Sequence, residues 1–226
     1  MSRHILLGVL CLYAFGGFVP ACMAGFITIS TPGSAHPLGG TYVNNTNLIA
    51  ITAPEFDLLT SLTDGFLTVD FSTEMQVRQV DTSWGNWSSP PFSESAFPTV
   101  LWTQGVTTLT MDFSQPVRSF GFELEPNEIG LFALTATFFN GANVVGAITD
   151  YEVEGDAGAR LFAGVVTLPS DLPFTSVQIT GAGKDFAIAQ LRYATIVAVP
   201  EPSMLTISFV LMTIWFPFRD CLIRRR

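Results

Sequence analysis

The chain has 226 residues, a formal net charge of −9 and 48% hydrophobic residues, so it is long enough for one substantial domain. Between Gly25 and Val199 it holds five basic and seventeen acidic residues, which excludes a basic surface for nucleic acid. This region has no cysteine, and its single histidine, His36, lies in a segment rich in Pro and Gly. Disulfides, thiolate zinc sites, cysteine nucleophiles and histidine triads are therefore not expected.

The N-terminus has the pattern of an export signal. A basic start at Arg3 precedes an apolar run that ends at Val19, and small residues follow. We expect residues 1–24 to form a signal helix that signal peptidase removes. The alternative is a lipid-modified Cys22, but a proline two residues before it does not suit a lipoprotein signal.

Strand-like patterns dominate the region that follows. Apolar and polar residues alternate in most of these segments, and Asn140-Gly141 favours a tight hairpin turn. No segment shows sustained helical spacing with caps. We therefore predict an all-β domain over residues 25–198, an antiparallel, jelly-roll-like β-sandwich of about eight to ten strands in two sheets. The predicted strands lie in segments 66–73, 107–114, 118–126, 131–149 (a hairpin), 174–180 and 186–196.

A loop-like segment, DTSWGNWSSPPFSESAF, carries Trp84 and Trp87 three residues apart, and Trp102 follows it. Aromatic side chains exposed on loops can stack on the faces of sugars, so these three tryptophans are candidate carbohydrate-binding residues. The favoured interpretation is that they pack the loop against the sandwich, where an indole N–H can find a buried partner.

Acidic residues alternate near the end of the predicted hairpin. If that strand is regular, its acids share one face, and a calcium ion would relieve their repulsion. The candidate ligands are Asp150, Glu152, Glu154 and Asp156. A solvated acidic edge that discourages strand pairing is the favoured interpretation. Apart from this structural calcium ion, we expect no cofactor.

Paired carboxylates are the remaining route to catalysis. Glycoside hydrolysis needs two of them flanking a cleft, and two acidic runs offer such pairs. These are Glu123, Glu125 and Glu128, and Asp150, Glu152 and Glu154. Solvated strand edges are the favoured interpretation of both runs, so we expect no catalytic residues.

The C-terminus combines three unlike features in order. The motif Val199-Pro200-Glu201-Pro202-Ser203 precedes an uncharged apolar run, Met204 to Phe218, and the chain ends in Arg224-Arg225-Arg226. As a helix the run would reach about 22 Å, only just enough to cross a membrane with the arginines on the cytoplasmic side. The two prolines would separate this transmembrane helix from the preceding domain.

These features resemble the PEP-CTERM sorting signal of exported bacterial proteins. The resemblance implies that exosortase, a membrane transpeptidase-like protease, reads residues 199–226, removes the helix at 204–218 and passes the protein to the cell envelope or an extracellular polysaccharide matrix. A tail anchor without processing is the alternative.

Two further phrases, SFGFELEPN (119–127) and FTSVQITGAGKDFAIAQLRYA (174–194), are similar to segments of β-sandwich ectodomains in PEP-CTERM proteins. That similarity supports the fold and implies no activity. We expect a non-enzymatic structural or polysaccharide-associated protein. Its partners would be signal peptidase, exosortase, the membrane before processing and extracellular polysaccharide. The alternative is a secreted glycan-acting enzyme that uses paired carboxylates.

Overall fold

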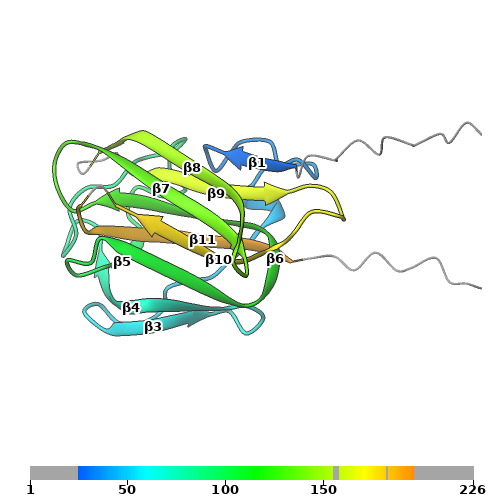
Figure 1. The fold of residues 1–226 in the computed structure, drawn as a ribbon. Coiled ribbons are helices and arrows are strands. Elements are labelled where there is room, and N and C mark those ends of the chain that lie inside the picture. The colour runs from blue at the N-terminus through cyan, green and yellow to red at the C-terminus, as the bar shows by residue number, and fades with distance from the viewer. Residues whose placement is uncertain (1–24, 155–157, 182, 196–226) are drawn as a thin grey trace, which may run out of the picture.

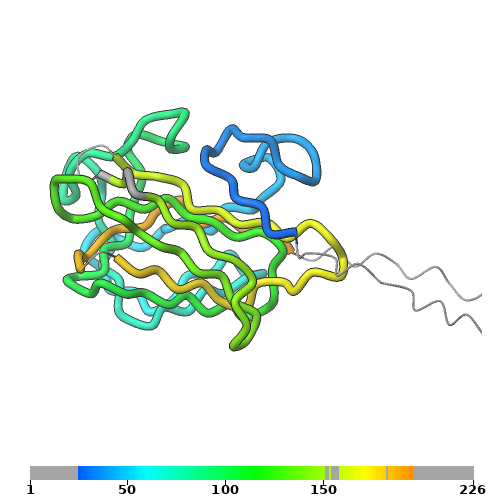
Figure 2. Tube along the Cα trace, turned by 45° about the horizontal axis from the view of Figure 1, so that its top comes forward, coloured from blue at the N-terminus to red at the C-terminus, as the bar shows by residue number. Residues whose placement is uncertain are grey.

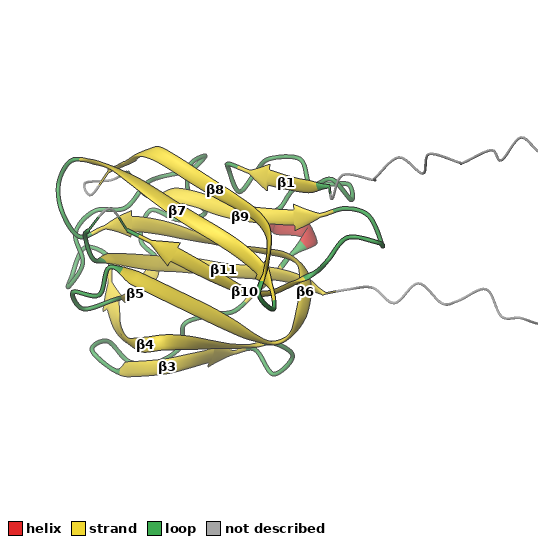
Figure 3. Ribbon diagram, in the orientation of Figure 1, coloured by secondary structure: helices red, strands yellow, loops and turns green. Residues whose placement is uncertain are grey.

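The computed structural model describes residues 25–154, 158–181 and 183–195. They form eleven antiparallel strands and one turn of 3-10 helix at Val43–Asn45 (Figure 3). The strands are β1 (Phe26–Ile29), β2 (Asn47–Leu48), β3 (Leu58–Thr63), β4 (Thr68–Gln79), β5 (Thr99–Trp102), β6 (Thr108–Pro126), β7 (Leu131–Asn140), β8 (Asn143–Glu154), β9 (Arg160–Val166), β10 (Phe174–Thr180) and β11 (Phe186–Thr195). Within the described ranges, no helix is long and apolar enough to cross a membrane.

The long strand β6 organises the fold. Its first half pairs with β4 on one side and β10 on the other, and its second half pairs with β9 and β11. Strand β4 likewise pairs with β6 early and with β5 later. Hydrogen bonding therefore joins all the described strands into one sheet that folds over on itself. In Figure 1, β7, β8 and β10 pass in front of β9 and β11.

The hydrophobic core lies between the two layers of this folded sheet. Phe120, Phe122 and Leu124 of β6 are fully buried in it. Their alternation in the sequence predicts that they share the core-facing side of the strand. Phe26 of β1 contacts Phe138 of β7, with ring centroids 5.4 Å apart. Such contacts hold the layer that contains β1 and β9 against the layer that contains β7, β8 and β10.

Two glycines make room for Phe26 between the layers. A Cβ atom on Gly146 of β8 would lie 2.4 Å from the ring of Phe26, and one on Gly164 of β9 would lie 2.6 Å from it. Such distances are far inside van der Waals contact, so side chains here would force the layers apart.

The all-β antiparallel architecture agrees with the sequence prediction, and Asn140-Gly141 lies at the turn between β7 and β8. Gly141 has the positive φ of +56° that such a turn requires. Three details differ. The described residues form eleven strands where about eight to ten were expected. The expected two sheets are one continuous folded sheet, and the segments 107–114 and 118–126 are a single strand.

Pro116 explains why two strands were expected where one is found. A proline cannot donate to a strand ladder, so it indicates a break. In β6 it falls in a register shift: Asp112 pairs with Ser176 and Val117 pairs with Phe174, and the residues between have no partner on β10. The strand continues because, among the described residues, no partner on β10 needs the missing N–H at this position.

The signal helix of residues 1–24, the motif Val199–Ser203, the transmembrane helix 204–218 and Arg224–Arg226 lie outside the described residues. They remain predictions.

Candidate functional site

The tryptophan loop, residues 81–98, folds down onto the outer face of β6 and β11. Trp87 is only 3% exposed and packs against Ala187 and Ala189, whose small side chains leave room for the indole. Its Nε1 donates to Oε2 of Glu123 at 2.9 Å. The rings of Trp87 are therefore not available to stack on a sugar, and the packing interpretation describes this residue.

A buried ion pair fastens the same loop from its other end. Glu94 of the loop receives two hydrogen bonds from Arg192 of β11, at 2.6 and 2.7 Å. Arg192 also donates to the carbonyl oxygens of Val43 and Thr46, at 3.2 and 3.1 Å. The side chains of Glu94 and Arg192 are 12% and 13% exposed, so this pair is largely withdrawn from water. One arginine thus joins the tryptophan loop to the segment before β2.

Glu123 lies at the centre of this buried network. It is fully buried, and its second carboxylate oxygen accepts from the backbone N–H of Glu94 at 2.6 Å. Burial raises its pKa to about 7, although the hydrogen bonds from Trp87 and Glu94 oppose that rise. The carboxylate is committed to holding the loop and faces no open cleft.

Trp84 occupies a different environment from Trp87. It is half-buried, its Nε1 donates to Oε2 of Glu125 at 2.9 Å, and its ring lies 6.5 Å from that of Trp102. Trp102 in turn donates to Oδ2 of Asp185 at 2.6 Å. The structure therefore brings these two predicted residues together, and Trp84 also packs against the buried cluster that contains Trp87.

A groove of about 450 Å³ lies beside Trp84, and we call it the Trp84 groove. Its lining is Trp84, Gly85, Asn86, Pro126, Asn127, Glu128 and Ile129. Asn127 is fixed by Asp185, which accepts from its backbone N–H at 2.9 Å and from its side-chain amide at 3.2 Å. Glu128 forms an ion pair with Lys184 at the surface.

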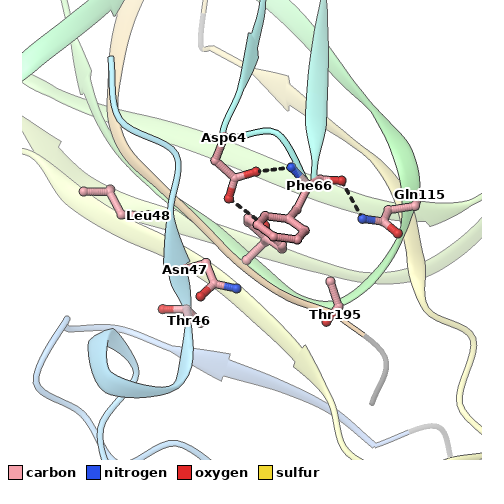
Figure 4. Close-up of a pocket in the computed structure, with 8 residues that line it drawn as sticks. Thr46, Asn47, Leu48, Asp64, Phe66, Gln115 and Thr195 are labelled. Atoms are coloured by element: carbon pink, nitrogen blue, oxygen red, sulfur yellow. Dashed lines mark hydrogen bonds between the residues drawn. The ribbon is translucent and has the colours of Figure 1, made fainter. Parts of the chain in front are cut away.

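A larger groove, of about 850 Å³, lies at the turn between β3 and β4, and we call it the Phe66 groove. Its lining is Thr46, Asn47, Leu48, Asp64, Phe66, Gln115, Tyr193 and Thr195. Figure 4 shows Phe66 between Asp64 and Gln115, with Thr46 and Asn47 on one side and Thr195 on the other. Four distant parts of the chain meet here: the segment at β2, the β3–β4 turn, the middle of β6 and the end of β11.

The turn that carries Phe66 is tightly held. The backbone N–H groups of Phe66 and Leu67 both donate to Oδ1 of Asp64 at 2.9 Å, and Gly65 supplies a positive φ of +91°. Gln115 donates to the carbonyl oxygen of Phe66 at 2.7 Å. The backbone is thereby fixed while the Phe66 side chain remains 80% exposed. An apolar ring is thus presented to solvent on a rigid support.

Asp64 and Tyr193 form the polar floor of the Phe66 groove. The hydroxyl of Tyr193 donates to Oδ2 of Asp64 at 2.6 Å. Burial and this hydrogen bond raise the pKa of Tyr193 to about 12, so it stays protonated at neutral pH. Burial alone would raise the pKa of Asp64, but hydrogen bonds from Tyr193, Leu67 and Phe66 hold it below the ordinary value. Asp64 is the only acidic residue in the described lining, which contains no basic residue.

The predicted calcium site falls mostly outside what the structure describes. Asp156 and the side chains of Glu152 and Glu154 are not described, and the described residues contain no cluster of metal-ligating side chains. The strand is also not regular at this point, since the register with β7 shifts between Asp150 and Val153. Calcium binding stays a prediction.

The Phe66 groove was not predicted from the sequence. The local signal was present, because Asp64-Gly65 before an apolar residue is typical of a tight turn between strands. The sequence gives no sign that Asp64 and Tyr193 form a hydrogen bond, because they are 129 residues apart in the chain.

No family model matches the chain, and no curated protein matches it. Solved structures resemble it only distantly. A mutant of a family 29 carbohydrate-binding module is 15% identical over 66% of this chain and 90% of that one, with a TM-score of 0.32. An apo cyclase from Fischerella sp. is 11% identical over 66% and 96%, with a TM-score of 0.37. These likenesses assign neither a fold family nor a function to this chain.

Proposed function

We propose that this chain is an exported, non-catalytic protein that binds an uncharged polysaccharide through the Phe66 groove. The observation that carries the proposal is the Phe66 ring, 80% exposed on a rigid turn at the rim of an open groove. A ligand that covers the exposed ring would gain free energy in proportion to the apolar area removed from water, about 25 cal/mol per Å². Sugar rings have apolar faces that can cover such a ring, and their hydroxyls can bond to side-chain amides and hydroxyls.

The charges around the groove define the class of glycan. Asp64 is ionised at neutral pH, and no basic residue stands among the described lining residues to pair with a uronic acid or a sulfate. The region from Gly25 to Val199 is strongly acidic as well, so its field repels acidic polymers. Asn47, Gln115 and Thr46 offer neutral hydrogen-bonding groups instead. An uncharged polysaccharide suits this lining.

A binding role is favoured over hydrolysis for a geometric reason. Hydrolysis of a glycosidic bond uses two carboxylates about 5 to 9 Å apart around the scissile bond. The described lining of the Phe66 groove offers Asp64 alone, and both of its oxygens are occupied by hydrogen bonds. Glu123, a candidate for such a pair, is buried beneath the tryptophan loop.

The binding proposal is tested with residues 25–198, run on native gels that contain galactomannan or hydroxyethyl cellulose. The domain should be retarded by at least one of these neutral polymers, and Phe66→Ala should be retarded much less. Phe97→Ala is the matched control, because Phe97 is 62% exposed and lies outside the groove. Equal retardation of Phe66→Ala and the original would overturn the proposal.

We further propose that the full chain is delivered by the PEP-CTERM route. Signal peptidase would remove residues 1–24, and exosortase would remove the helix after Pro200-Glu201-Pro202, releasing the domain to the envelope or matrix. The support is the order of the motif, the apolar run and the terminal arginines in the sequence. Mass spectrometry of the exported protein tests it. Replacing Pro200-Glu201-Pro202 by alanines should leave the chain bound to the membrane, and normal trimming of that variant would contradict the route.

A further inference from the structure

The Trp84 groove repeats the chemical elements of the Phe66 groove with different residues. An indole ring lies beside two amide side chains, Asn86 and Asn127, and one carboxylate, Glu128. The indole is held in place by Glu125 and by the ring of Trp102, and Asn127 is held by Asp185. A fixed aromatic side chain with amides at its edge is a second surface that suits a sugar ring.

The two grooves lie at opposite ends of the same strand. Asn127, in the Trp84 groove, bonds to Asp185 directly before β11 begins, and Pro126 pairs with Phe186. Tyr193 and Thr195, at the far end of β11, line the Phe66 groove. A strand of ten residues extends about 30 Å, at about 3.3 Å per residue. Figure 1 shows β11 running across the width of the molecule.

The surface between the grooves offers no path for one extended chain along β11. The strand is buried over most of its length, with the core on one face and the tryptophan loop on the other. In Figure 2, the N-terminal segment, in blue, covers a further part of the same layer, where β1 pairs with β9. A ligand in one groove is therefore separate from a ligand in the other.

We propose that the Trp84 groove is a second binding site for uncharged polysaccharide, so that one domain bridges two glycan chains. This inference rests on the proposed function, because it assigns the same ligand class to both grooves. A protein with two such sites connects polymer chains in a matrix, and each weak contact gains from the other through effective concentration.

The test is a capture experiment with galactomannan as the probe, repeated with hydroxyethyl cellulose. One polymer is immobilised, the domain is added and washed, and fluorescently labelled polymer of the same kind is then applied. The original domain should retain the label, with sedimentation establishing that the protein is a monomer under these conditions. A monomer that binds the immobilised polymer but captures no label would overturn the bridging proposal and leave the proposed function intact. A domain that binds neither polymer would defeat both.

Two variants assign the capture to the two grooves. Gly85→Arg places a long side chain in the Trp84 groove without strain, because a Cβ at Gly85 meets open space and its φ is not positive. We expect it to keep binding to the immobilised polymer and to lose capture of the label by about tenfold or more. Gly33→Arg is the matched control, since Gly33 has the same freedom and lies in neither groove. Full capture by Gly85→Arg would overturn the proposal. Phe66→Ala should likewise bind through one groove only and lose capture.

Discussion

The tryptophan loop and the turn at Phe66 are both connections between strands that carry aromatic residues, but they use them in opposite ways. In the loop, Trp87 turns inward and bonds to Glu123. In the turn, the backbone is fixed by Asp64 and the Phe66 ring points to solvent. The difference arises from what each carboxylate binds. Beneath the loop, Glu123 accepts a hydrogen bond from the aromatic side chain, whereas within the turn Asp64 accepts hydrogen bonds from the backbone. An aromatic residue in a polar connection is therefore a binding candidate only when part of its ring stays open to a groove or to solvent.

The largest expected effect comes from the ion pair that fastens the tryptophan loop. Arg192→Ala leaves Glu94 without its partner in a largely buried position, and should lower the free energy of unfolding by about 3 kcal/mol or more. Lys184→Ala breaks the pair with Glu128, whose side chains are 38% and 52% exposed, and should cost less than about 1 kcal/mol. Urea unfolding measures both. Similar losses in the two variants would remove the distinction between the buried loop and the open surface.

A smaller loss of stability is expected when only the indole N–H donor of Trp87 is removed. Trp87→Phe keeps an aromatic ring against Ala187 and Ala189 but leaves one oxygen of Glu123 without its donor, at a cost of about 1 to 3 kcal/mol. Trp84→Phe removes a donor to Glu125, which is as buried as Glu123, so its cost should fall in the same range. Unfolding midpoints measure both losses, and an unchanged midpoint in Trp87→Phe would show that its hydrogen bond to Glu123 does not stabilise the fold.

The buried carboxylate should also make stability depend on pH. Because burial raises the pKa of Glu123 to about 7 from an ordinary 4.5, the folded state binds more protons than the unfolded state between these values. This group therefore contributes stability below about pH 4.5, and the contribution is lost as the pH rises through about 7.

Glu123→Gln cannot ionise, so the fall in stability between about pH 4.5 and 7 should be less steep in this variant, by up to about 1.4 kcal/mol per pH unit. Above about pH 7 the amide also lacks one of the two hydrogen bonds that the carboxylate accepts from Trp87 and Glu94. Unfolding curves across this pH range measure the difference. Parallel pH profiles for the two proteins would show that Glu123 does not titrate there.

The strands in which apolar and polar residues alternate could be predicted from the sequence, and the others could not. The segments at β4, β10 and β11 show period-two patterns, and the structure has strands there. Strand β9 has six buried residues in succession, so it shows no alternation to detect. Pro116 masked the continuity of β6, because only the register of β10 shows that no N–H donor is needed at this position.

The candidate site could be predicted only in part, for a related reason. Composition indicated a loop with tryptophans, but their exposure depends on Glu123 and Glu125 beneath them, which the sequence presents as a separate acidic strand. Phe66 showed no separate signal, because it is the first residue of the predicted strand 66–73, whereas β4 begins at Thr68. Its exposure follows from Asp64, in the same turn, and from Gln115, which is 49 residues away in the chain and lies in β6.

The most direct test measures binding and stability on the same samples of Phe66→Ala. We expect the affinity for a neutral polysaccharide to fall by about tenfold or more, since an exposed aromatic anchor is lost. The free energy of unfolding should change by less than about 0.5 kcal/mol, because the ring is 80% exposed. Unchanged affinity in a stable Phe66→Ala protein would contradict the claim that this turn presents a ligand-binding residue.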